Sequence, residues 1–587
     1  DDARRSAKGR LGKGRGALAG LLLLAAALLL PGLGAAPFER AEIYFLDAAR
    51  AMVESGDWLV PRYGGEPFFD KPALAYWLMA ASMNVFGATA AAGRLVSALA
   101  ALGVLGATVW LGGLLLGRRS ALCGGLVLAT TLAFVSFGRL AMSDMLMTLW
   151  TTLAAALGVI AFGAAPGALA MPALGAVLGL GFLTKGPVAV LLPGLGLVLL
   201  AVQARRAQRP WPTPRALLLA AAVFLPVALG WFGVVAHRLG SEPLRYFFLS
   251  ENLERFAGAT YDSEQPPWYY LTAYLALGLP WSPLLPLAVR RAWRGTAPPL
   301  RFLLGWAFLM AVPLSLSRGK IDYYLLPLLP PLGLAIGHLF ACEPWRAWER
   351  HVARGLLVAA AAALLLIVLG RGPTLPREWL PAAPVLALAA GVAAGGAALC
   401  LWGAARWRPV RTLGVLAGVT AALIFGLATF FVPAFAAGQP QQALLGEVRE
   451  ELRYRPEAAL VLCGDPARVQ RAVLFEARRG SQERCDLWAA ATDDAPALFL
   501  LDADEQQSVG RTLRGISAHR YLPADTLTLR GLLAPPRPAW LYLGANFATE
   551  SPVALRKEGR EYRKAVLARR AARQARERRA AREGEPR

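Results

Sequence analysis

About thirteen apolar stretches run between Gly16 and Pro433, and most contain roughly 16 to 24 residues rich in Leu, Ala, Val and Gly. A helix of that length, rising about 1.5 Å per residue, is long enough to cross a hydrocarbon core of about 30 Å. A water-soluble fold would leave too much of this apolar surface exposed. The sequence therefore predicts an all-α, polytopic membrane protein.

Run length, together with the charged residues and prolines that interrupt the runs, gives the expected spans. They lie at residues 16–35, 86–116, 120–137, 144–165, 168–184, 187–203, 216–236, 268–289, 301–316, 323–341, 355–370, 382–403 and 412–433. A hydrophobic content of 56% and a mean hydropathy of +0.44 agree with this interpretation. The length of 587 residues also requires parts outside the membrane.

The polar connections alternate between Arg-rich and Arg-poor, and the positive-inside rule places the Arg-rich ones in the cytoplasm. The basic connections contain Arg4 to Arg15, Arg118 and Arg119, Arg205 to Arg215, Arg290 to Arg301, Arg346 to Arg354, and Arg406 to Arg411. We therefore expect thirteen spans, an internal N-terminus, and an external position for everything after about residue 434. A cleaved signal peptide over residues 4–36 is the alternative, but the alternating loops favour an uncleaved first span.

The composition divides the chain into three expected parts. Residues 1–435 form the membrane domain, with a first outer loop at 36–85. Residues 436–547 form a small soluble α/β domain, expected to be periplasmic, with strands at 459–463, 497–501 and 540–544 and helices at 443–452 and 466–479. Residues 548–587 form a basic tail, either helical or disordered.

The net charge of +23 comes largely from loop arginines and this tail, so no nucleic-acid partner is expected. Five cysteines and four scattered histidines without a C-x-x-C motif argue against a Cys/His zinc site. Cys463 and Cys485 either pair in an oxidising compartment or remain free thiols.

The first outer loop holds the largest group of polar residues. Within it, residues 41–54 place apolar side chains at helical spacing, which predicts an amphipathic helix in the interface. Glu39, Glu42 and Asp47 then either form a solvated face or, together with Lys71 in the turn F-F-D-K-P, face an anionic lipid head group and the hydroxyl that attacks it.

Further polar residues fall in the outer loops or at the outer ends of spans, where a buried charge is costly without a partner or a task. They are Arg94, Arg139, Asp144, Lys185, Arg255, Arg318, Lys320, Tyr323 and Tyr324. One outer cavity lined by them would neutralise a phosphate and position a sugar.

These residues belong to motifs that follow one another along the chain. They are A-E-I-Y-F-L-D-A-A-R-A-M-V-E-S-G-D-W-L-V-P-R-Y-G-G-E-P-F-F-D-K-P-A-L-A-Y-W-L in the first loop, then G-R-L-V-S-A-L, R-L-A-M-S-D, F-L-T-K-G-P, E-N-L-E-R-F, P-W-Y-Y and S-R-G-K-I-D-Y-Y-L-L-P. The series resembles bacterial lipid-linked-sugar glycosyltransferases of the GT-C superfamily, in particular the aminoarabinose transferases acting on lipid A and the protein-mannosyltransferase-like family. The resemblance covers roughly residues 15–435.

The resemblance implies roles for individual residues. It implies that Glu42, Glu39 or Asp144 acts on the acceptor proton, that Lys71 holds the donor phosphate, and that Asp70 is a possible contact for a divalent metal ion. It implies substrate contacts for Tyr76, Arg94, Arg139, Lys185, Arg255, Arg318, Lys320 and Tyr324.

The sequence departs from the family pattern in the first loop. The Asp that precedes Glu42 in the family is Ala41 here, the Arg that the family has two residues after Glu42 is Tyr44, and a His before P-W-Y-Y is missing. Glu39 is a candidate replacement for the lost carboxylate, whereas Glu42 matches a family acidic position directly and is favoured as the base. Failure of both would leave a member with altered acceptor or lost activity.

The expected function is transfer of a sugar from a polyprenyl-phosphate donor to a glycolipid or protein acceptor at the periplasmic face of the bacterial inner membrane. The leaving phosphate requires cations and the acceptor requires a base, while direct attack inverts the anomeric centre. A membrane transporter or flippase for a lipid-linked sugar is the alternative. It would show inverted repeats and charges at mid-span, and neither is evident in the sequence.

Overall fold

The structure is a computed structural model of the whole chain. It describes residues 2–356 apart from 37, 38, 165, 166, 255, 257, 259–264, 295–297, 343 and 344; residues 409–432; and residues 447, 448, 450, 451 and 453 with five strands in the C-terminal part. The chain divides into two compact units, Asp1–Ala436 and Ala437–Arg587.

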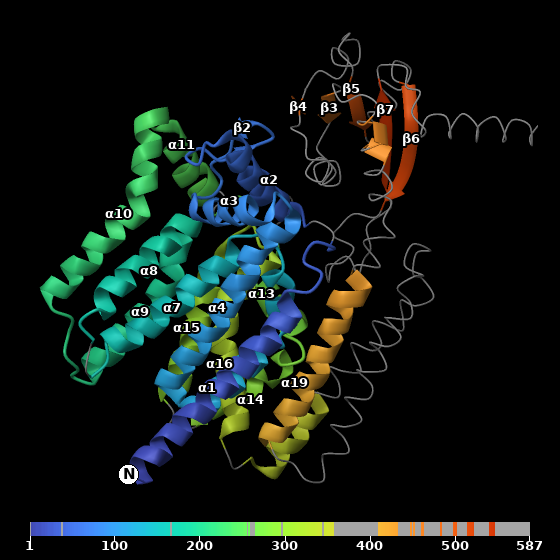
Figure 1. Cartoon of the computed structure of the whole chain (residues 1–587). Helices are drawn as coiled ribbons and strands as arrows, with labels where there is room; N and C mark the ends of the chain where they lie inside the picture. Colours follow the sequence, from blue (N-terminus) through green and yellow to red (C-terminus); the bar gives the residue numbers. More distant parts are fainter. Residues whose placement is uncertain are drawn as a thin grey trace, which may run out of the picture. The chain divides into compact units, whose positions relative to one another are not determined.

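The first unit is helical, with one short hairpin in its first loop (Figure 1). Its elements are α1 (Asp2–Leu29), α2 (Arg40–Ser55), β1 (Arg62–Tyr63), β2 (Glu66–Pro67), α3 (Leu74–Phe86), α4 (Ala90–Leu116), α5 (Arg118–Ala129), α6 (Leu132–Gly138), α7 (Asp144–Ala161), α8 (Ala170–Lys185), α9 (Val188–Arg206), α10 (Pro214–Leu239), α11 (Glu242–Arg245), the π-helix η1 (Tyr246–Glu254), α13 (Tyr269–Leu277), η2 (Ser282–Leu284), α14 (Leu285–Arg294), α15 (Pro298–Leu316), η3 (Asp322–Leu328), α16 (Leu329–Ala341), α19 (Pro409–Gly426) and η7 (Leu427–Phe431).

Seven helices among the described residues are long and apolar enough to cross a membrane, and counting each of two bent helix pairs as one span raises this number to nine. Shorter apolar helices occupy Gly16–Leu29, Ala73–Phe86 and Ala170–Lys185. The chain is thus a polytopic, mainly helical membrane protein. The count of thirteen spans stays a prediction, since the expected spans at 355–370 and 382–403 fall almost wholly outside the described residues.

Two stretches expected to be single spans are broken helices. The stretch at 120–137 bends by 63° between α5 and α6, and the stretch at 268–289 bends by 117° between α13 and the η2–α14 segment. Thr130 is one cause, because its hydroxyl donates to the Leu126 carbonyl at 2.7 Å and offers the backbone an alternative to continued helix. Pro280 is another, because it lacks an N–H.

The two breaks contact each other. The Leu132 amide donates to the Leu279 carbonyl at 3.1 Å, and the Trp281 indole N–H donates to the Thr130 hydroxyl oxygen at 3.1 Å. Backbone groups freed at membrane depth must find protein partners. Each break therefore supplies hydrogen-bond partners to the other.

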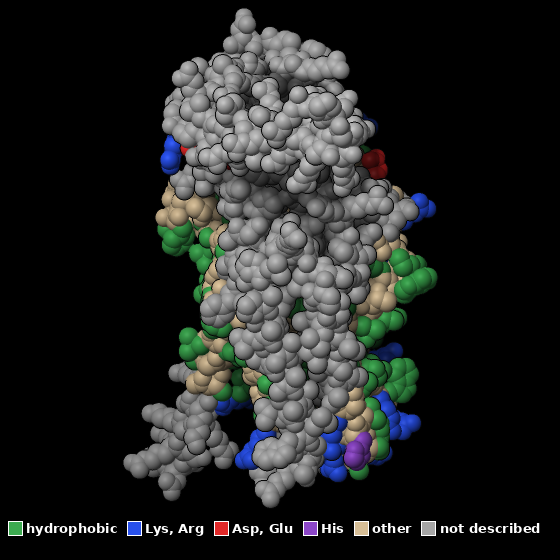
Figure 2. Space-filling view, turned by 90° about the vertical axis from the view of Figure 1, so that its right-hand side faces the viewer, with side chains coloured by type: hydrophobic (Ala, Val, Ile, Leu, Met, Phe, Trp, Pro, Cys, Tyr) green, Lys and Arg blue, Asp and Glu red, His purple; other side chains and the backbone are tan. Residues whose placement is uncertain are grey.

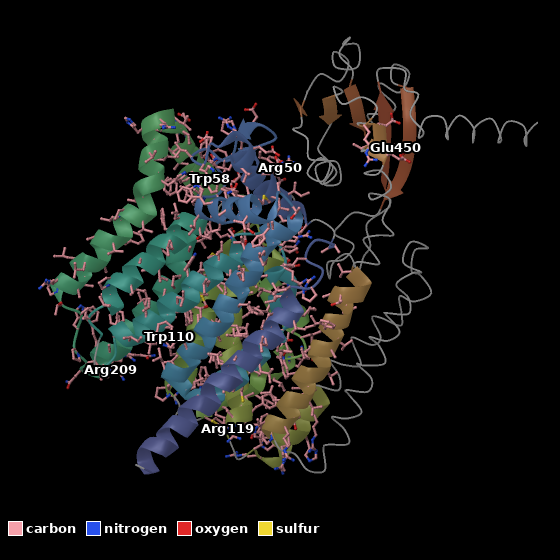
Figure 3. All side chains as sticks on the ribbon, in the orientation of Figure 1. Arg50, Trp58, Trp110, Arg119, Arg209 and Glu450 are labelled. Carbon is pink, nitrogen blue, oxygen red and sulfur yellow. The ribbon has the colours of Figure 1, made fainter. Side chains whose placement is uncertain are left out.

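Charged side chains divide between the two ends of the helical unit. Arg119 and Arg209 lie at one end, while Arg50 and Trp58 lie at the opposite end (Figure 3). On the face in Figure 2, Lys and Arg side chains gather at the lower end, and the visible acidic side chains lie toward the other. The first loop therefore lies at the end opposite the Arg-rich connections.

An ion-pair cluster holds the Arg-rich end together. Glu349, with 7% of its side chain exposed, accepts hydrogen bonds from the Arg291 guanidinium at 2.9 and 3.3 Å and from the Arg346 amide at 2.9 Å. The Arg291 guanidinium also lies 4.9 Å from the ring centre of Trp345. Burial alone would raise the pKa of Glu349, but these hydrogen bonds and the charges of Arg291 and Arg290 hold it below its ordinary value.

The second unit contains a five-stranded sheet in the order β4-β3-β5-β7-β6. Its strands are β3 (Ala459–Leu462), β4 (Gln482–Glu483), β5 (Ala497–Leu501), β6 (Arg514–Tyr521) and β7 (Ala539–Ala545). The pairs β3–β4 and β3–β5 are parallel, whereas β7 is antiparallel to β5 and β6. The three predicted strands are present. The helix expected at 466–479, Cys463, Cys485 and the tail at 548–587 lie outside the described residues.

Candidate active site

The first loop opens with a helix whose start is capped by its own carboxylates. Glu39 precedes α2, and its side chain accepts from the Ala41 amide at 2.5 Å, while the Glu39 amide donates to Glu42 at 2.9 Å. This reciprocal arrangement is a capping box, built here with Glu as the N-cap residue. Gly56, at φ 71°, ends the helix. The helix predicted at 41–54 is present as α2, and Glu39 is half-buried beside Ala41.

Glu42 is not on a solvated face. Its side chain is fully buried and forms a two-point ion pair with Arg94, at 2.5 Å to Nη2 and 3.0 Å to Nε. The Ala141 amide donates to the same carboxylate at 3.0 Å. With its oxygens already engaged inside the protein, Glu42 is poorly placed to accept a proton from a substrate, which argues against the favoured sequence assignment.

Arg94 and Arg139 act within the fold. Arg94 has no exposed surface, and its Nη1 donates to the carbonyls of Leu33 at 2.6 Å and Ala36 at 2.9 Å. Arg139 donates to the Leu28 and Leu29 carbonyls at 3.2 and 3.0 Å, at the carboxyl end of α1. These contacts fix the chain between α1 and α2. A substrate contact for Arg94 stays a prediction without geometric support, because all three of its nitrogens already donate to Glu42, Leu33 or Ala36.

Asp144, Lys185 and Tyr324 lie together, although they come from α7, α8 and η3. Asp144 and Lys185 form a buried ion pair, and the Lys185 ammonium lies 4.6 Å from the ring centre of Tyr324. The Tyr323 ring centre is 5.8 Å from the same ammonium. Three predicted site residues thus form one cluster, with the two charges neutralising each other.

The chain leading to Asp144 is held from both sides. Met142 exchanges hydrogen bonds with the Ser97 hydroxyl at 3.1 and 3.3 Å, and the Ala141 amide is held by Glu42 as described above. The position of Asp144 therefore depends on the Glu42–Arg94 ion pair.

Lys71 lies at the other end of the first loop, immediately before α3. Its ammonium donates to the Glu251 carboxylate at 3.1 Å and to the Asp70 carbonyl at 2.7 Å. The Asp70 carboxylate accepts from the Tyr246 hydroxyl at 2.8 Å. The Lys71 side chain keeps 19% of its surface exposed, against 6% for Glu251. We call Asp70, Lys71, Tyr76, Tyr246 and Glu251 the Lys71 cluster.

Tyr76 completes this cluster from the first turn of α3. Its side chain is fully buried, and its hydroxyl finds no hydrogen-bond partner among the described residues. Asp70, Glu251 and Tyr246 are close enough to interact electrostatically with this phenol. A buried hydroxyl without a partner is unusual and suggests a donor kept for a ligand.

An aromatic cluster anchors the Lys71 turn to the rest of the unit. Phe69, just before the turn, packs with Trp231 of α10 at a ring-centre distance of 6.2 Å, and Phe232 packs with Phe247 of η1 at 5.3 Å. The Trp231 indole also donates to the Leu59 carbonyl at 3.0 Å. These contacts bring segments far apart in sequence to one end of the unit, the end at which α2, α3, β2 and α11 are drawn (Figure 1).

Two of the remaining predicted cations, Arg318 and Lys320, lie between α15 and η3. Lys320 is 5% exposed and donates to the carbonyls of Gln265 at 2.8 Å and Ser317 at 2.6 Å. Burial lowers the pKa of Lys320. Arg318 is exposed, and no described side chain forms an ion pair with it. Arg255 lies outside the described residues.

The described residues contain no group of three or more His, Cys, Asp or Glu side chains able to hold a metal ion. Asp70 is instead engaged with Tyr246. A metal at Asp70 stays a prediction without geometric support.

Two residues of the Lys71 cluster were missed by the sequence assignments. Glu251 is the first residue of the E-N-L-E-R-F motif, and Tyr246 lies five residues before it. The E-N-L-E-R-F motif was the sequence feature from which Glu251 could have been assigned to the site. The pairing of residue 251 with residue 71, across 180 positions, is not encoded in any local spacing.

Comparison with known proteins defines the class. The family model described as dolichyl-phosphate-mannose-protein mannosyltransferase matches residues 70–231. ArnT from Cupriavidus metallidurans bound to undecaprenyl phosphate superposes with a TM-score of 0.72 at 21% identity, covering 92% of this chain and 99% of that one. The helical unit thus has the fold of a GT-C membrane glycosyltransferase.

Two relatives identify the family. The undecaprenyl phosphate-alpha-4-amino-4-deoxy-L-arabinose arabinosyl transferase of Pseudomonas paraeruginosa is 36% identical over 312 residues, which is 51% of this chain and 54% of that protein. The same transferase of Yersinia enterocolitica is 31% identical over 380 residues, which is 62% of this chain and 67% of that protein. The chain belongs to this aminoarabinose transferase family, although its match to the Pseudomonas relative spans only about half of that protein's length.

Proposed function

We propose that the chain transfers a sugar from a polyprenyl-phosphate donor to a lipid A-like glycolipid. The observation that carries this is the Lys71 cluster, in which a partly exposed lysine side chain and a buried phenol without a hydrogen-bond partner among the described residues both lie close to Asp70 and Glu251. The relatives are named for a donor of this kind, undecaprenyl phosphate carrying aminoarabinose. The reported matches are transferases, and the transporter alternative gains no support.

In this proposal the donor's phosphate binds at Lys71. The sugar leaves the phosphate as the acceptor attacks, so negative charge grows on the phosphate oxygens in the transition state. A charge-assisted hydrogen bond from the Lys71 ammonium therefore stabilises the transition state more than it stabilises the ground state. We assign a second hydrogen bond to the phosphate to the Tyr76 hydroxyl, which lies close to Asp70 and Glu251. One displacement inverts the anomeric carbon and leaves no covalent enzyme intermediate.

We assign the base to Glu39 in preference to Glu42. Glu39 is half-buried at the start of α2, beside the position where the family pattern has Asp and this chain has Ala41. Glu42 is fully buried and engaged with Arg94. Asp144 is a weaker candidate because Lys185 already neutralises it.

The site is proposed to face the periplasm. The first loop lies at the end opposite Arg119 and Arg209 (Figure 3), and Arg-rich connections remain cytoplasmic. Ser55→Cys and Arg206→Cys, one at each end, test this. A membrane-impermeant maleimide added to cells with a permeabilised outer membrane should label residue 55 and spare residue 206, and the reverse pattern would contradict the proposed orientation.

The activity test uses purified protein, undecaprenyl-phosphate-linked aminoarabinose and lipid A. Mass spectrometry should detect lipid A carrying the added sugar, and Lys71→Met should lower the rate by roughly 10- to 100-fold, the loss expected for a charge-assisted contact to phosphate. Arg62→Met removes a cation of the same loop that donates a hydrogen bond to the Gly65 carbonyl at 3.3 Å, and should leave the rate near wild type. No product from the wild-type protein, or equal losses in the two variants, would reject the proposal.

A further inference from the structure

The Lys71 ammonium already has an anionic partner in this structure. Glu251 approaches it to 3.1 Å, and the Glu251 side chain is 6% exposed. This contact joins the first loop to the π-helix η1, across 180 positions of sequence. The group that the proposed function needs for a phosphate is therefore occupied by a carboxylate.

The π-helix brings both of its contacts to one face. Tyr246 binds the Asp70 carboxylate and Glu251 binds Lys71, so residues five apart on η1 hold two consecutive loop residues. In an α-helix with about 3.6 residues per turn, residues five apart point about 140° away from each other. In a π-helix, hydrogen bonds run from i to i+5, so such residues recur about one turn apart. π-helical turns are rare and concentrate at functional sites.

Binding of a phosphate to the Lys71 ammonium is unfavourable while the Glu251 carboxylate remains paired with it. A phosphate oxygen within hydrogen-bond distance of the Lys71 ammonium would lie within a few ångströms of the Glu251 carboxylate, in a partly buried site where like charges repel strongly. A carboxylate and a phosphate oxygen present the same kind of acceptor to an ammonium. The two anions therefore compete for one cation.

We infer that Glu251 is a displaceable carboxylate that occupies the Lys71 ammonium when the site is empty and yields it to the donor's phosphate. Glu251 is thus a positioning residue that acts through Lys71 and does not touch the reacting atoms. It keeps the ammonium paired in the absence of donor and sets how tightly a phosphate binds. This inference rests on the proposed phosphate site at Lys71.

The first experiment measures the dissociation constant of undecaprenyl phosphate for the full-length protein in detergent micelles. Glu251→Gln removes the competing charge but keeps the side-chain shape, so binding should tighten roughly tenfold, the effect of about 1.4 kcal/mol. Glu242→Gln changes a carboxylate that is 82% exposed and pairs with Arg245, and should leave the constant unchanged. An unchanged or larger dissociation constant for Glu251→Gln would overturn the inference.

A second measurement needs no substitution. A water-soluble carbodiimide joins a lysine and a carboxylate in direct contact as an amide, and peptide mass spectrometry locates the link. The 71–251 link should form in the empty protein and decline as undecaprenyl phosphate saturates the site. A link that persists at saturation would show that Glu251 stays on Lys71.

The two proposals fail in different ways. If Lys71→Met binds undecaprenyl phosphate as well as wild type, the phosphate site itself is wrong and the inference fails with it. If Lys71→Met loses binding while Glu251→Gln equals wild type, the phosphate site stands and only the displaceable carboxylate is rejected.

Discussion

Gly124 of α5 and Gly337 of α16 touch backbone to backbone, so that a Cβ on Gly337 would lie 2.2 Å from the Gly124 amide nitrogen and 2.4 Å from its Cα. Small residues permit such close approach between membrane helices. Because the obstructing atoms are backbone, neither helix can yield by turning a side chain.

Gly337→Ala should therefore separate α5 from α16 and destabilise the protein by roughly 1 to 3 kcal/mol, the usual cost of overpacking. Thermal unfolding in detergent measures the loss. Gly106→Ala is the matched control, since a Cβ there meets nothing within 4 Å. Equal melting temperatures for the two variants would show that the contact does not constrain the fold.

Glu42→Gln should destabilise the protein strongly, because it leaves the charge of the fully buried Arg94 without its anion. Removing one partner of a buried ion pair typically costs about 3 to 5 kcal/mol. Glu54→Gln on the same helix changes a side chain that is 54% exposed, and the expected effect is below about 0.5 kcal/mol. The free energy of unfolding in denaturant distinguishes the two variants. A Glu42→Gln protein as stable as Glu54→Gln would show that the Glu42–Arg94 ion pair does not stabilise the fold.

Glu39→Gln should lower turnover by roughly 10²-fold or more while donor binding is nearly retained, because Gln keeps the shape but cannot take the proton. The amide oxygen of Gln still accepts from the Ala41 amide, so α2 should remain capped. Steady-state rates and the undecaprenyl-phosphate dissociation constant separate the two effects. Full turnover by this variant would remove Glu39 as the base and direct attention to Asp144 or Asp70.

The Glu349 cluster predicts a pH dependence of stability. The folded-state pKa of Glu349 lies below the ordinary value of 4.5, so the ionised carboxylate stabilises the folded state above about pH 4.5, and this stabilisation is lost as the pH falls through the lowered folded pKa. The melting-temperature difference between wild type and Glu349→Gln should stay constant between about pH 5.5 and 7 and shrink below about pH 4.5. A difference that grows on acidification would contradict the assignment.

Local patterns predicted local structure well. The helix at 41–54 and the strands at 459–463, 497–501 and 540–544 follow from periodicity and from short apolar runs. β6 was missed because its sequence, R-G-I-S-A-H-R-Y, mixes charged and polar residues with few apolar ones. The bend at 268–289 was missed because run length counts apolar residues but not the partners that stabilise a break.

The site was only partly predictable for a related reason. Lys71 and Tyr76 could be placed on the first loop by motif, and the structure brings them into one cluster. The partners of these residues and of Arg94 are set by tertiary contacts between distant segments. The sequence therefore predicted Glu42 as a base, although Glu42 is paired with Arg94 in the structure. Sequence identified which residues carry charge, whereas packing decided which charges neutralise each other.

The paired breaks of the broken helices also affect how the protein is made. The Leu132 amide is satisfied by Leu279, a residue that the ribosome adds well over a hundred positions later. Until then, the first broken segment carries an unpaired backbone group that lipid cannot satisfy. The nascent segment at 118–138 must therefore remain in contact with protein or water at first. Its final burial in the membrane is coupled to the insertion of the segment at 269–294 rather than to its own synthesis.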